Sequence, residues 1–403
     1  MANKSLTAIV IGAGIAGCST AYALSKRGIA VTLIDRHEQV AQEASGNPVG
    51  MLYPKFNTGI SAISAIAERG FAYTLSLLRQ MSANQEIYRL CGQIQLANTI
   101  REKDKQSLLN VKLKQAFDIQ PLNAKEASRI ANIELLNGGL YIAESGWVKP
   151  QLLCQALIES QLIKKLMTTS AIHIKQIEDF WQVTFQEKSA LETDIVVLAN
   201  ANDIVQFEQC NTIPITAVRG QINFFPSNSV SNELKTILCT DHYLGPNVDG
   251  FHSIGTSYAP NDMNPQLSSV DTNDNLRALS AISTALYKSI DTDEVTGRVA
   301  WRSATRDYIP LAGQLINNHQ LRKKPPRYND KPTNLPWLKG LYMNAGHGSK
   351  GLITAPLCGE LIANLVNQEP LIVDPLIASK MNPSRFMLRE MGLKKIAQNL
   401  YDI

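Results

Sequence analysis

Three arginines lie within nine positions of one another, at Arg298, Arg302 and Arg306. Side chains alternate along a β-strand, so all three would point to one face if the segment 297–310 forms a strand. A buried guanidinium is costly unless it meets a carboxylate. The segment therefore predicts a site for a substrate carboxylate. For any one of these arginines, the alternative is a structural ion pair with a protein acid such as Asp307.

The elements that position such a site begin near the N-terminus. The apolar, β-branched run 6–11 predicts a strand buried on both faces, and residues 18–27 predict a helix. Between them lies a G-x-G-x-x-G sequence, made of Gly12, Ala13, Gly14, Ile15, Ala16 and Gly17. A second strand, 31–34, ends on Asp35. This order of strand, glycine loop, helix and acid predicts a dinucleotide site, the alternative being a glycine turn that binds nothing.

The residue types in this loop match the needs of a dinucleotide. Gly12 allows the tight turn, Gly14 lets backbone approach a pyrophosphate, and Gly17 lets the helix pack against the strand. The helix N-terminus offers free N–H donors to the phosphates. Asp35 would accept hydrogen bonds from the ribose hydroxyls of the adenosine.

The kind of dinucleotide depends on the segments that follow. Arg36 could hold a 2′-phosphate, so the residues around Asp35 do not by themselves decide between FAD and NAD. The small-residue loop 45–51 suits close passage beneath a tightly held flavin, and the buried strand 194–198 runs into a second nucleotide-facing turn. These features favour FAD over NAD. Arg219 lines the flavin edge or forms a salt bridge within the protein. The predicted contacts beyond the first loop are Asp35, Arg36, Ser45, Gly46, Asn47, Gly50, Met51, Ile174, Ala199, Asn200, Arg219 and Arg302.

A second glycine-rich loop follows a predicted strand at 341–345 and precedes a predicted helix at about 352–366. Its glycines and the helix start would gather backbone N–H donors where a reduced flavin carries negative charge. Lys350 would add a positive charge there, or is a solvated surface lysine. His347 is better explained as a loop residue that bonds to backbone than as a catalytic base. The predicted contacts in this loop are Gly346, His347, Gly348, Ser349, Lys350, Gly351 and Leu352.

Composition describes the kind of chain that carries these motifs. Its 403 residues, 44% hydrophobic and 18% charged, are enough for a large core and two domains. Six scattered cysteines favour a reducing compartment and exclude a disulfide scaffold and a cysteine-type zinc site. No apolar run is long enough for a membrane span, and the first strand and helix are read as fold and not as a signal peptide. The net charge of +4 permits an acidic partner without requiring one. We therefore expect a cytoplasmic protein that binds no metal and no membrane.

The fold class predicted is α/β, or α+β overall. A Rossmann-like FAD-binding domain is expected from residues 1–80, 146–216 and 336–403. A discontinuous substrate domain with an antiparallel sheet is expected from residues 81–145 and 217–335, with crossing strands at 213–225 and a helix at 272–288.

Several motifs, in this order, also match a known family. They are the G-x-G-x-x-G loop, the S-G-N-P-V-G-M-L-Y-P segment from Ser45, the R-G-Q element from Arg219, and the W-R-S-A-T-R-D-Y-I-P strand from Trp301. The chain thereby resembles the D-amino-acid-oxidase-like flavoproteins, which include glycine oxidase and sarcosine oxidase. A narrower set of segments, at 239–244, 255–258, 302–310, 346–351 and 381–386, is similar to the FAD-dependent oxidase domain of the bifunctional tRNA 5-methylaminomethyl-2-thiouridine biosynthesis proteins.

The narrower resemblance covers nearly the whole chain, with two departures. The bifunctional proteins carry an N-terminal methyltransferase domain, whereas this sequence starts directly at the flavin fold. Methyl transfer is thus expected to be absent or to reside on a separate tRNA methyltransferase that acts on the product. Lys350 stands where the family suggests arginine. The lysine keeps the positive charge and lacks the bidentate hydrogen-bonding geometry of arginine.

The resemblance implies a substrate and a reaction. The substrate would be the wobble uridine in the anticodon loop of a tRNA, bearing a 5-carboxymethylaminomethyl group, which is an N-substituted glycine. Its methylene would be oxidised to an imine, which water hydrolyses to glyoxylate and a 5-aminomethyl nucleoside.

The predicted catalytic residues are Arg302, Tyr243, Tyr258 and Lys350. Arg302 is implied as the carboxylate ligand by glycine-oxidase-like relatives. The two tyrosines are candidate carboxylate partners or pocket walls, with core positions as the alternative. In relatives such as sarcosine oxidase, a cysteine just before the region of the carboxylate-binding arginine carries the flavin covalently. No cysteine lies between Cys239 and Cys358 here, so the resemblance implies non-covalent FAD.

Two other functions stay open at this point. An oxidase of free glycine, sarcosine or D-amino acids would use the same Arg302, and a flavin-bound RNA-binding protein would need no turnover. Two basic segments suit docking of an RNA loop, namely 322–327 with Tyr328 adjoining, and 385–389 with Lys394 and Lys395. Their alternative is an ordinary solvated surface.

Overall fold

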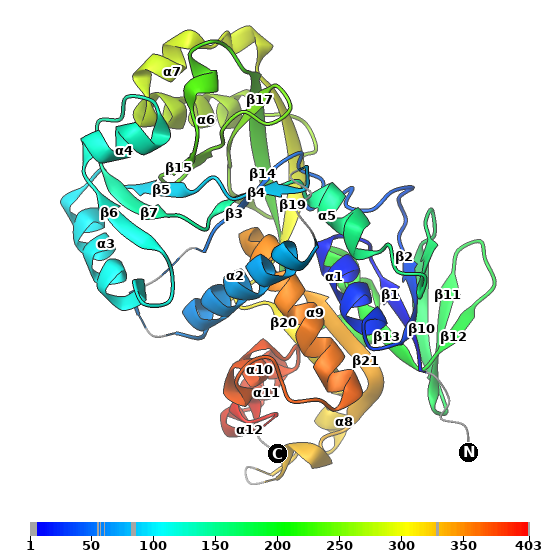
Figure 1. Ribbon diagram of the computed structural model, residues 1–403. Coiled ribbons are helices and arrows are strands. Elements are labelled where there is room, and N and C mark those ends of the chain that lie inside the picture. The colour runs from blue at the N-terminus through cyan, green and yellow to red at the C-terminus, as the bar shows by residue number, and fades with distance from the viewer. Residues whose placement is uncertain are drawn as a thin grey trace.

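The computed structural model describes residues 6–401 apart from residues 55, 57, 60, 82–85, 328 and 329. Two large sheets organise the chain, one of six strands and one of nine (Figure 1). Within the described residues, no helix is both long and apolar enough to cross a membrane.

The six-stranded sheet has the order β20-β21-β13-β1-β2-β9. Its strands are parallel except β20, which runs antiparallel to β21. The central strands are short, apolar runs, as expected for strands covered on both faces. Their bounds are β1 (Thr7–Ile11), β2 (Ala30–Ile34), β9 (Ile163–Leu166), β13 (Ile195–Leu198), β20 (Leu311–Ile316) and β21 (Trp337–Ala345).

Alternate residues of β1 enter two different cores. Ala8 and Val10 pack with four helices on one face, namely α1 (Ile15–Ser25), α2 (Ala62–Gln80), α5 (Pro150–Leu157) and α9 (Gly351–Asn367). Ile9 and Ile11 pack on the other face with a small antiparallel sheet, made of β10 (Ala171–Ile177), β11 (Phe180–Phe185) and β12 (Leu191–Thr193). This burial of both faces makes the sheet a rigid base for the loops at its carboxyl edge.

The nine-stranded sheet has the order β18-β14-β17-β16-β15-β5-β7-β6, with β19 paired to β14. It is antiparallel except where β15 runs parallel to β5. Its strands are β5 (Gln93–Leu96), β6 (Ile119–Leu122), β7 (Gly139–Ile142), β14 (Ile215–Pro226), β15 (Ile237–Cys239), β16 (Tyr243–Leu244), β17 (Phe251–Gly255), β18 (Ala259–Pro260) and β19 (Thr296–Thr305). The helices of this region are α3 (Ile100–Leu113), α4 (Ala124–Ala131), α6 (Ser269–Ile282) and α7 (Thr284–Ser289).

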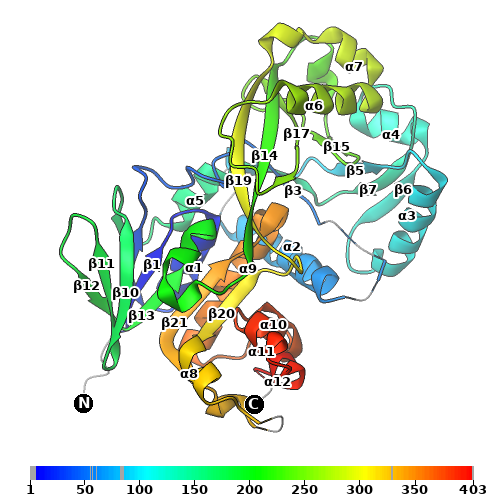
Figure 2. The ribbon, with the colours of Figure 1, turned by 180° about the vertical axis from the view of Figure 1, so that it is seen from behind.

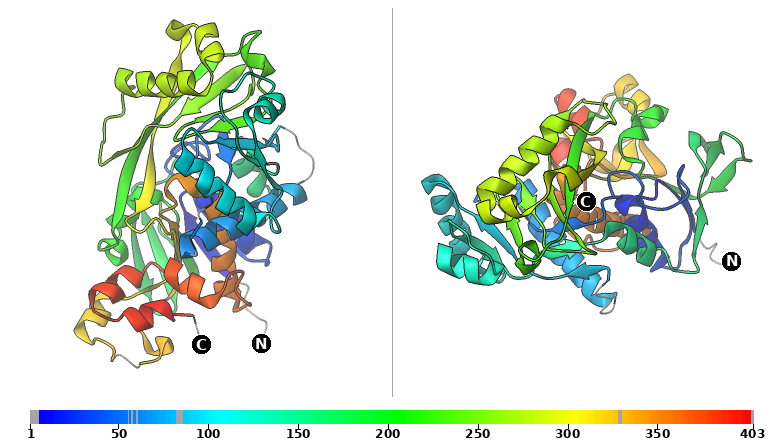
Figure 3. Two further views of the ribbon diagram at one scale, coloured as in Figure 1. Left: turned by 90° about the vertical axis from the view of Figure 1, so that its left-hand side faces the viewer. Right: turned by 90° about the horizontal axis from the view of Figure 1, so that it is seen from above.

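A three-stranded sheet of β3 (Gly50–Leu52), β8 (Gly146–Val148) and β4 (Tyr88–Arg89) lies between the two large sheets. Four further helices are α8 (Asn318–Lys323), α10 (Pro375–Met381), α11 (Arg385–Glu390) and α12 (Lys394–Gln398). Helices α10 to α12 gather at the end of the molecule opposite α6 and α7 (Figure 3).

The expected strands and helices around both glycine loops are present as β1, α1, β2, β13, β21 and α9. The helix expected at 272–288 is two helices, because Ser283 leaves α6 and caps α7. One boundary differs from the prediction. Residues 217–335 were assigned to the substrate domain, whereas β20 pairs with β21 in the six-stranded sheet. The long strands β14 and β19 connect the two regions (Figure 2), and the buried apolar run of β20 does not reveal which sheet it joins.

Candidate functional site

The turn after β1 brings backbone segments into close contact. Gly12 has φ +103°, and a Cβ atom there would lie 2.6 Å from the carbonyl oxygen of Ala199. A Cβ atom on Gly17 would lie 1.7 Å from the carbonyl oxygen of Gly12. Helix α1 therefore starts this close to the strand only because both residues are glycine.

The N-terminus of α1 has donors available for an anion. Gly14 provides no side-chain cap, and the N–H of Ile15 donates to Ser45 Oγ at 3.0 Å. Asn200, whose Cα faces Gly12, has a buried Oδ1 atom with no hydrogen-bond partner in the described part of the chain. A diphosphate fits this cradle, because first-turn N–H groups and the helix dipole both favour negative charge.

Asp35 lies beside this cradle, at the carboxyl end of β2. Its carboxylate accepts hydrogen bonds from the backbone N–H groups of Ala13, at 2.7 Å, and His37, at 2.8 Å. These bonds hold the side chain between the first glycine loop and the end of the strand. The carboxylate is thereby placed where it can accept hydrogen bonds from a ribose.

Arg36 does not offer an open site for a 2′-phosphate. Its guanidinium forms ion pairs with Glu43, at 2.7 Å, and Asp203, at 2.9 Å. His37 also contacts Glu43, at 2.8 Å. These two carboxylates already neutralise the charge of Arg36, so the region beside Asp35 favours an adenosine ribose without a 2′-phosphate.

The loop that was expected to pass beneath the flavin is held from the other sheet. Arg298, on β19, donates to the carbonyl oxygens of Gln42 and Glu43 at 2.8 and 2.7 Å, and to Asn47 Oδ1 at 3.0 Å. A Cβ atom on Gly46 would lie 2.7 Å from this guanidinium. The structural role of Arg298 is therefore to fix the cofactor loop, and its partners are backbone and amide oxygens.

Arg302 has a different environment. On β19 it pairs with Val218 of β14, and its guanidinium lies over Gly220, where a Cβ atom would be 2.4 Å from Nη1. It donates to the carbonyl oxygen of Ser257 at 3.3 Å and to Thr256 Oγ1. No carboxylate lies within 4.0 Å of it among the residues the structure describes. Burial lowers the pKa of this arginine, so the site favours an anion that would stabilise its charge.

Three tyrosines surround this guanidinium closely enough to act on its charge, namely Tyr53, Tyr243 and Tyr258. Burial raises the pKa of Tyr53 and of Tyr243, so both hydroxyls remain protonated and can donate hydrogen bonds. Tyr258 is 54% exposed and lies at the rim. Tyr53 was missed in the sequence, although it comes two residues after Met51 in a segment already singled out.

The second glycine loop lies against the same strand. An isolated β-bridge joins His347 to Ala304, two residues after Arg302. The His347 Nδ1 atom lies 2.9 Å from Thr354 Oγ1, and its buried Nε2 atom has no partner in the described residues. Burial lowers the pKa of His347 to about 3, so the ring is neutral at physiological pH. The His347 ring thus contacts a side chain of helix α9, whereas a bond to backbone was predicted.

Lys350 precedes helix α9, which begins without a side-chain cap. With His347 and Tyr308 it lines a pocket of about 230 Å³ at the start of that helix. Gly50 is in contact here too, since a Cβ atom on it would lie 2.6 Å from Leu352 Cδ1. The loops predicted at 45–51 and 346–352 therefore meet, although they are about three hundred residues apart.

Two predicted cofactor contacts lie inside the protein core. Arg219 is 2% exposed and forms an ion pair with Asp271, while donating to the carbonyl oxygens of Asn264 and Gln266. This is the salt-bridge alternative left open in the sequence. Ile174 is 1% exposed in the core beneath β10, and its carbonyl oxygen accepts from Gln209. The internal contacts of both side chains leave no exposed face for a cofactor.

The basic segments also need correction. Arg385 is fully buried, pairs with Asp307 through two hydrogen bonds of 3.0 and 2.8 Å, and so cannot face an RNA. The alternative in which Asp307 pairs with Arg298, Arg302 or Arg306 does not hold, because its partners are Arg385 and Arg389. The segment 322–327 follows β20 at the edge of the sheet opposite the cofactor turn, because Ile316 pairs with Trp337. Tyr328 lies outside the described residues.

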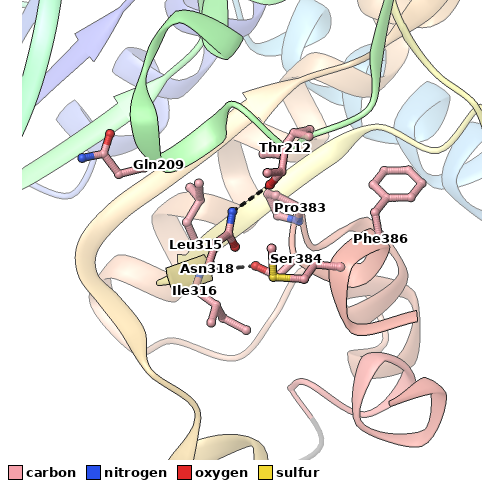
Figure 4. A pocket seen from close by; sticks show the side chains of 10 residues that line it. Gln209, Thr212, Leu315, Ile316, Asn318, Pro383, Ser384 and Phe386 are labelled. Atoms are coloured by element: carbon pink, nitrogen blue, oxygen red, sulfur yellow. Dashed lines mark hydrogen bonds between the residues drawn. The ribbon is translucent and has the colours of Figure 1, made fainter. Parts of the chain in front are cut away.

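A pocket of about 270 Å³ opens at that opposite edge (Figure 4). Asn318 donates to Thr212 Oγ1 at 2.9 Å and the N–H of Ile316 donates to Ser384 Oγ at 3.2 Å. None of its lining residues is titratable. It therefore lacks the charged groups that the Arg302 region brings together.

Comparison with known proteins agrees with this geometry. Residues 7–365 match the family described as "FAD dependent oxidoreductase". The chain belongs to this family. This FAD-dependent oxidoreductase contains the G-x-G-x-x-G cradle, Asp35 and the loop at 346–351 described above.

Curated relatives extend the comparison. The chain is 36% identical over 403 residues to the tRNA 5-methylaminomethyl-2-thiouridine biosynthesis bifunctional protein MnmC of Methylobacillus flagellatus, covering 99% of the chain and 62% of the relative. It is 38% identical over 398 residues to the protein of the same name from Pseudomonas syringae, covering 95% of the chain and 59% of the relative. The chain thus spans about three fifths of the length of these relatives.

Solved structures support the fold of this FAD-dependent oxidoreductase. Glycine oxidase from Geobacillus kaustophilus is similar with a TM-score of 0.76 at 20% identity, covering 93% of this chain and 98% of that one. Iminodiacetate oxidase from Chelativorans sp. BNC1 has a TM-score of 0.76 at 19% identity, with 91% and 97% covered. The chain therefore has the fold of these oxidases, as the resemblance in the sequence predicted.

Proposed function

We propose that this protein oxidises the carboxymethylaminomethyl group on the wobble uridine of a tRNA. The product would be the 5-aminomethyl nucleoside, with release of glyoxylate. The observation that carries the proposal is Arg302, a partly buried guanidinium with no carboxylate within 4.0 Å among the described residues, in a chain whose relatives are named for biosynthesis of a modified tRNA uridine.

The chemistry proposed is the loss of two electrons and a proton from the glycine methylene. Bound FAD, which fits non-covalently, supplies the hydride acceptor. Arg302 would bind the substrate carboxylate, and Tyr53 and Tyr243 would donate hydrogen bonds beside it. With the carboxylate fixed, one C–H bond is oriented for transfer, which is the main contribution required of the protein. Water then cleaves the C=N bond, leaving the amine on the nucleoside and the aldehyde on glyoxylate.

Lys350 and the N–H groups at the start of α9 would stabilise negative charge at the cofactor. Tyr258 stands at the rim and would contact the RNA outside the carboxylate site. The amine produced lacks one methyl group compared with the nucleoside in the relatives' names, so a tRNA methyltransferase is proposed to act next. We propose that the protein performs these roles in the cytoplasm.

The second candidate is an oxidase of small amino acids such as glycine or sarcosine. The observation that favours it is the fold shared with glycine oxidase and iminodiacetate oxidase. It would use Arg302 in the same way and would need no RNA contacts.

Anaerobic single turnover distinguishes the two. Flavin absorbance near ~450 nm falls when a hydride reaches the cofactor. We expect rapid bleaching by tRNA that carries 5-carboxymethylaminomethyluridine, with glyoxylate in the quenched mixture, and slow bleaching by sarcosine. Bleaching by the small amines alone would assign the second function. A purified protein without flavin would contradict both.

A further inference from the structure

Two tyrosine side chains stand exposed beside the Arg302 site. Tyr258 is 54% exposed and Tyr308 is 63% exposed. Burial and the proximity of Tyr308 raise the pKa of Tyr258. Large exposed rings that gather at one place on a folded protein mark a surface for binding.

The position of the pair relates it to the reaction site. Tyr258 directly follows Ser257, whose carbonyl oxygen accepts from Arg302 at 3.3 Å. Tyr308 lines the pocket of about 230 Å³ that also contains His347 and Lys350. Tyr258 thus adjoins the carboxylate site, and Tyr308 adjoins the second glycine loop.

The backbone of Tyr308 is held in a conformation that favours glycine. Its φ is +56°, in the left-handed region, where a bulky residue is rare. The turn is fixed by the bond from the Tyr308 N–H to the carbonyl oxygen of Thr305, at 3.1 Å, and by Asp307, which Arg385 holds with two hydrogen bonds. Because the Tyr308 ring is mostly exposed, its packing within the protein offsets little of the free-energy cost of this conformation. The ring is therefore available for contact with another molecule.

Arg306 lies two residues before Tyr308 in the same turn. It is exposed, its guanidinium lies 5.1 Å from the ring centroid of Phe386, and no carboxylate pairs with it in the described part of the chain. Exposed aromatic faces together with an exposed guanidinium suit single-stranded nucleic acid, because bases stack on the rings and a phosphate meets the charge.

We propose that Tyr258 and Tyr308 form a stacking surface for a base next to the reacting nucleoside, with Arg306 on the adjoining phosphate. This inference rests on the proposed function. It assigns to Tyr258, Tyr308 and Arg306 the preference for a glycine group carried on RNA over a free amino acid. A free amino acid small enough to reach Arg302 does not extend to the exposed ring faces. The pair therefore contributes to binding of RNA and not to oxidation of a small amine.

The decisive variant is Tyr308→Gly, because glycine adopts the positive φ without strain and keeps the turn. Its kcat/KM is measured with modified tRNA and with sarcosine, and the ratio of the two is compared with wild type. The loss of one stacked base predicts a fall in this ratio of about 5- to 150-fold. Tyr308→Phe keeps the ring and is expected to stay within about threefold of wild type.

Phe251→Ala is the matched control. Phe251 is also an exposed aromatic, 49% exposed, at the end of β17 remote from Gly255 and the site. Its substitution is expected to leave the ratio unchanged. Equal losses on both substrates in Tyr308→Gly, or an unchanged ratio, would overturn the proposal.

If modified tRNA does not reduce the flavin of the wild-type protein, the affinity for unmodified tRNA is measured instead by filter binding. A weaker affinity in Tyr308→Gly than in Phe251→Ala keeps the stacking surface even when the proposed oxidation fails, and equal affinities reject it.

Discussion

Replacing Arg302 by methionine separates a substrate ligand from a structural arginine. Methionine keeps much of the side-chain volume and removes the charge. A guanidinium–carboxylate contact of two charge-assisted hydrogen bonds contributes about 1.5–3 kcal/mol per bond. The variant is thus expected to lose about 10²- to 10⁴-fold in kcat/KM.

The stability of the same variant carries the sharper test. Among the described residues Arg302 bonds to Ser257 and Thr256, and burial already disfavours its charge. The loss of these bonds is offset by the removal of a partly buried charge, so the free energy of unfolding should change by only about 1 kcal/mol. Arg219→Met is the control, because it leaves Asp271 without its ion-pair partner. It should cost about 3–5 kcal/mol.

Both variants are assayed by urea unfolding and by anaerobic flavin reduction, after their absorbance spectra confirm bound FAD. If Arg302→Met unfolds as easily as Arg219→Met, Arg302 is a structural residue and the assignment of the carboxylate site is wrong. The assignment is equally refuted if flavin reduction by the modified tRNA stays within threefold of wild type.

Three further outcomes follow from contacts within the site. Gly220→Ala places a methyl group 2.4 Å from the Arg302 guanidinium; because that flexible side chain can shift, we expect at least a tenfold loss of kcat/KM with normal FAD content, and normal kinetics would contradict the geometry. Asp35→Asn replaces the carboxylate that accepts a hydrogen bond from the Ala13 N–H with a neutral amide. It should raise the dissociation constant of FAD about 10- to 100-fold, measured by fluorescence quenching when FAD is added back to the apoprotein. The pKa of His347 is about 3 in the folded protein and about 6.5 in the unfolded chain. As the pH drops below about 6.5, the unfolded chain therefore binds a proton at this residue before the folded protein does. Its contribution to stability is therefore full above that pH and is lost on acidification, at up to about 1.4 kcal/mol per pH unit. Urea unfolding of wild type and His347→Gln from pH 7 to pH 5 checks this, since only wild type should carry the additional slope.

Local patterns predicted the local parts of the site. The strand, glycine loop, helix and acid around Asp35 follow from residues that are close in sequence, and the structure contains each of them. The second glycine loop and α9 follow in the same way. Such elements are set by short-range hydrogen bonding and hydrophobic spacing, which a sequence displays directly.

The role of each arginine could not be predicted in this way. Arg219 and Arg302 both lie on long strands among small residues, yet only Arg219 meets a carboxylate, from Asp271 on a distant helix. Arg385 looked like part of a basic surface and is buried against Asp307 from the β19–β20 turn. Whether an arginine binds substrate depends on which acids the tertiary fold brings near it, and sequence spacing carries no information about that.

Tyr308 was missed for a related reason. The motif R-D-Y-I-P predicted a strand, while the structure bends after Thr305 and leaves the tyrosine in a left-handed conformation. The bend is maintained by Arg385, from a helix near the other end of the chain. Nothing local distinguishes this tyrosine from one that faces the core.

The strand order of the six-stranded sheet has a consequence for how the protein is made. β1 ends at Ile11, but its neighbour β13 begins at Ile195, and β21 ends at Ala345. At about 5–20 residues per second, a ribosome needs on the order of 10–40 s to supply β13 and about 20–70 s to supply β21. For that time one hydrophobic edge of β1 is unpaired and open to other nascent chains. Extra chaperone that covers this edge during synthesis should therefore raise the yield of folded enzyme more than any change to the finished surface.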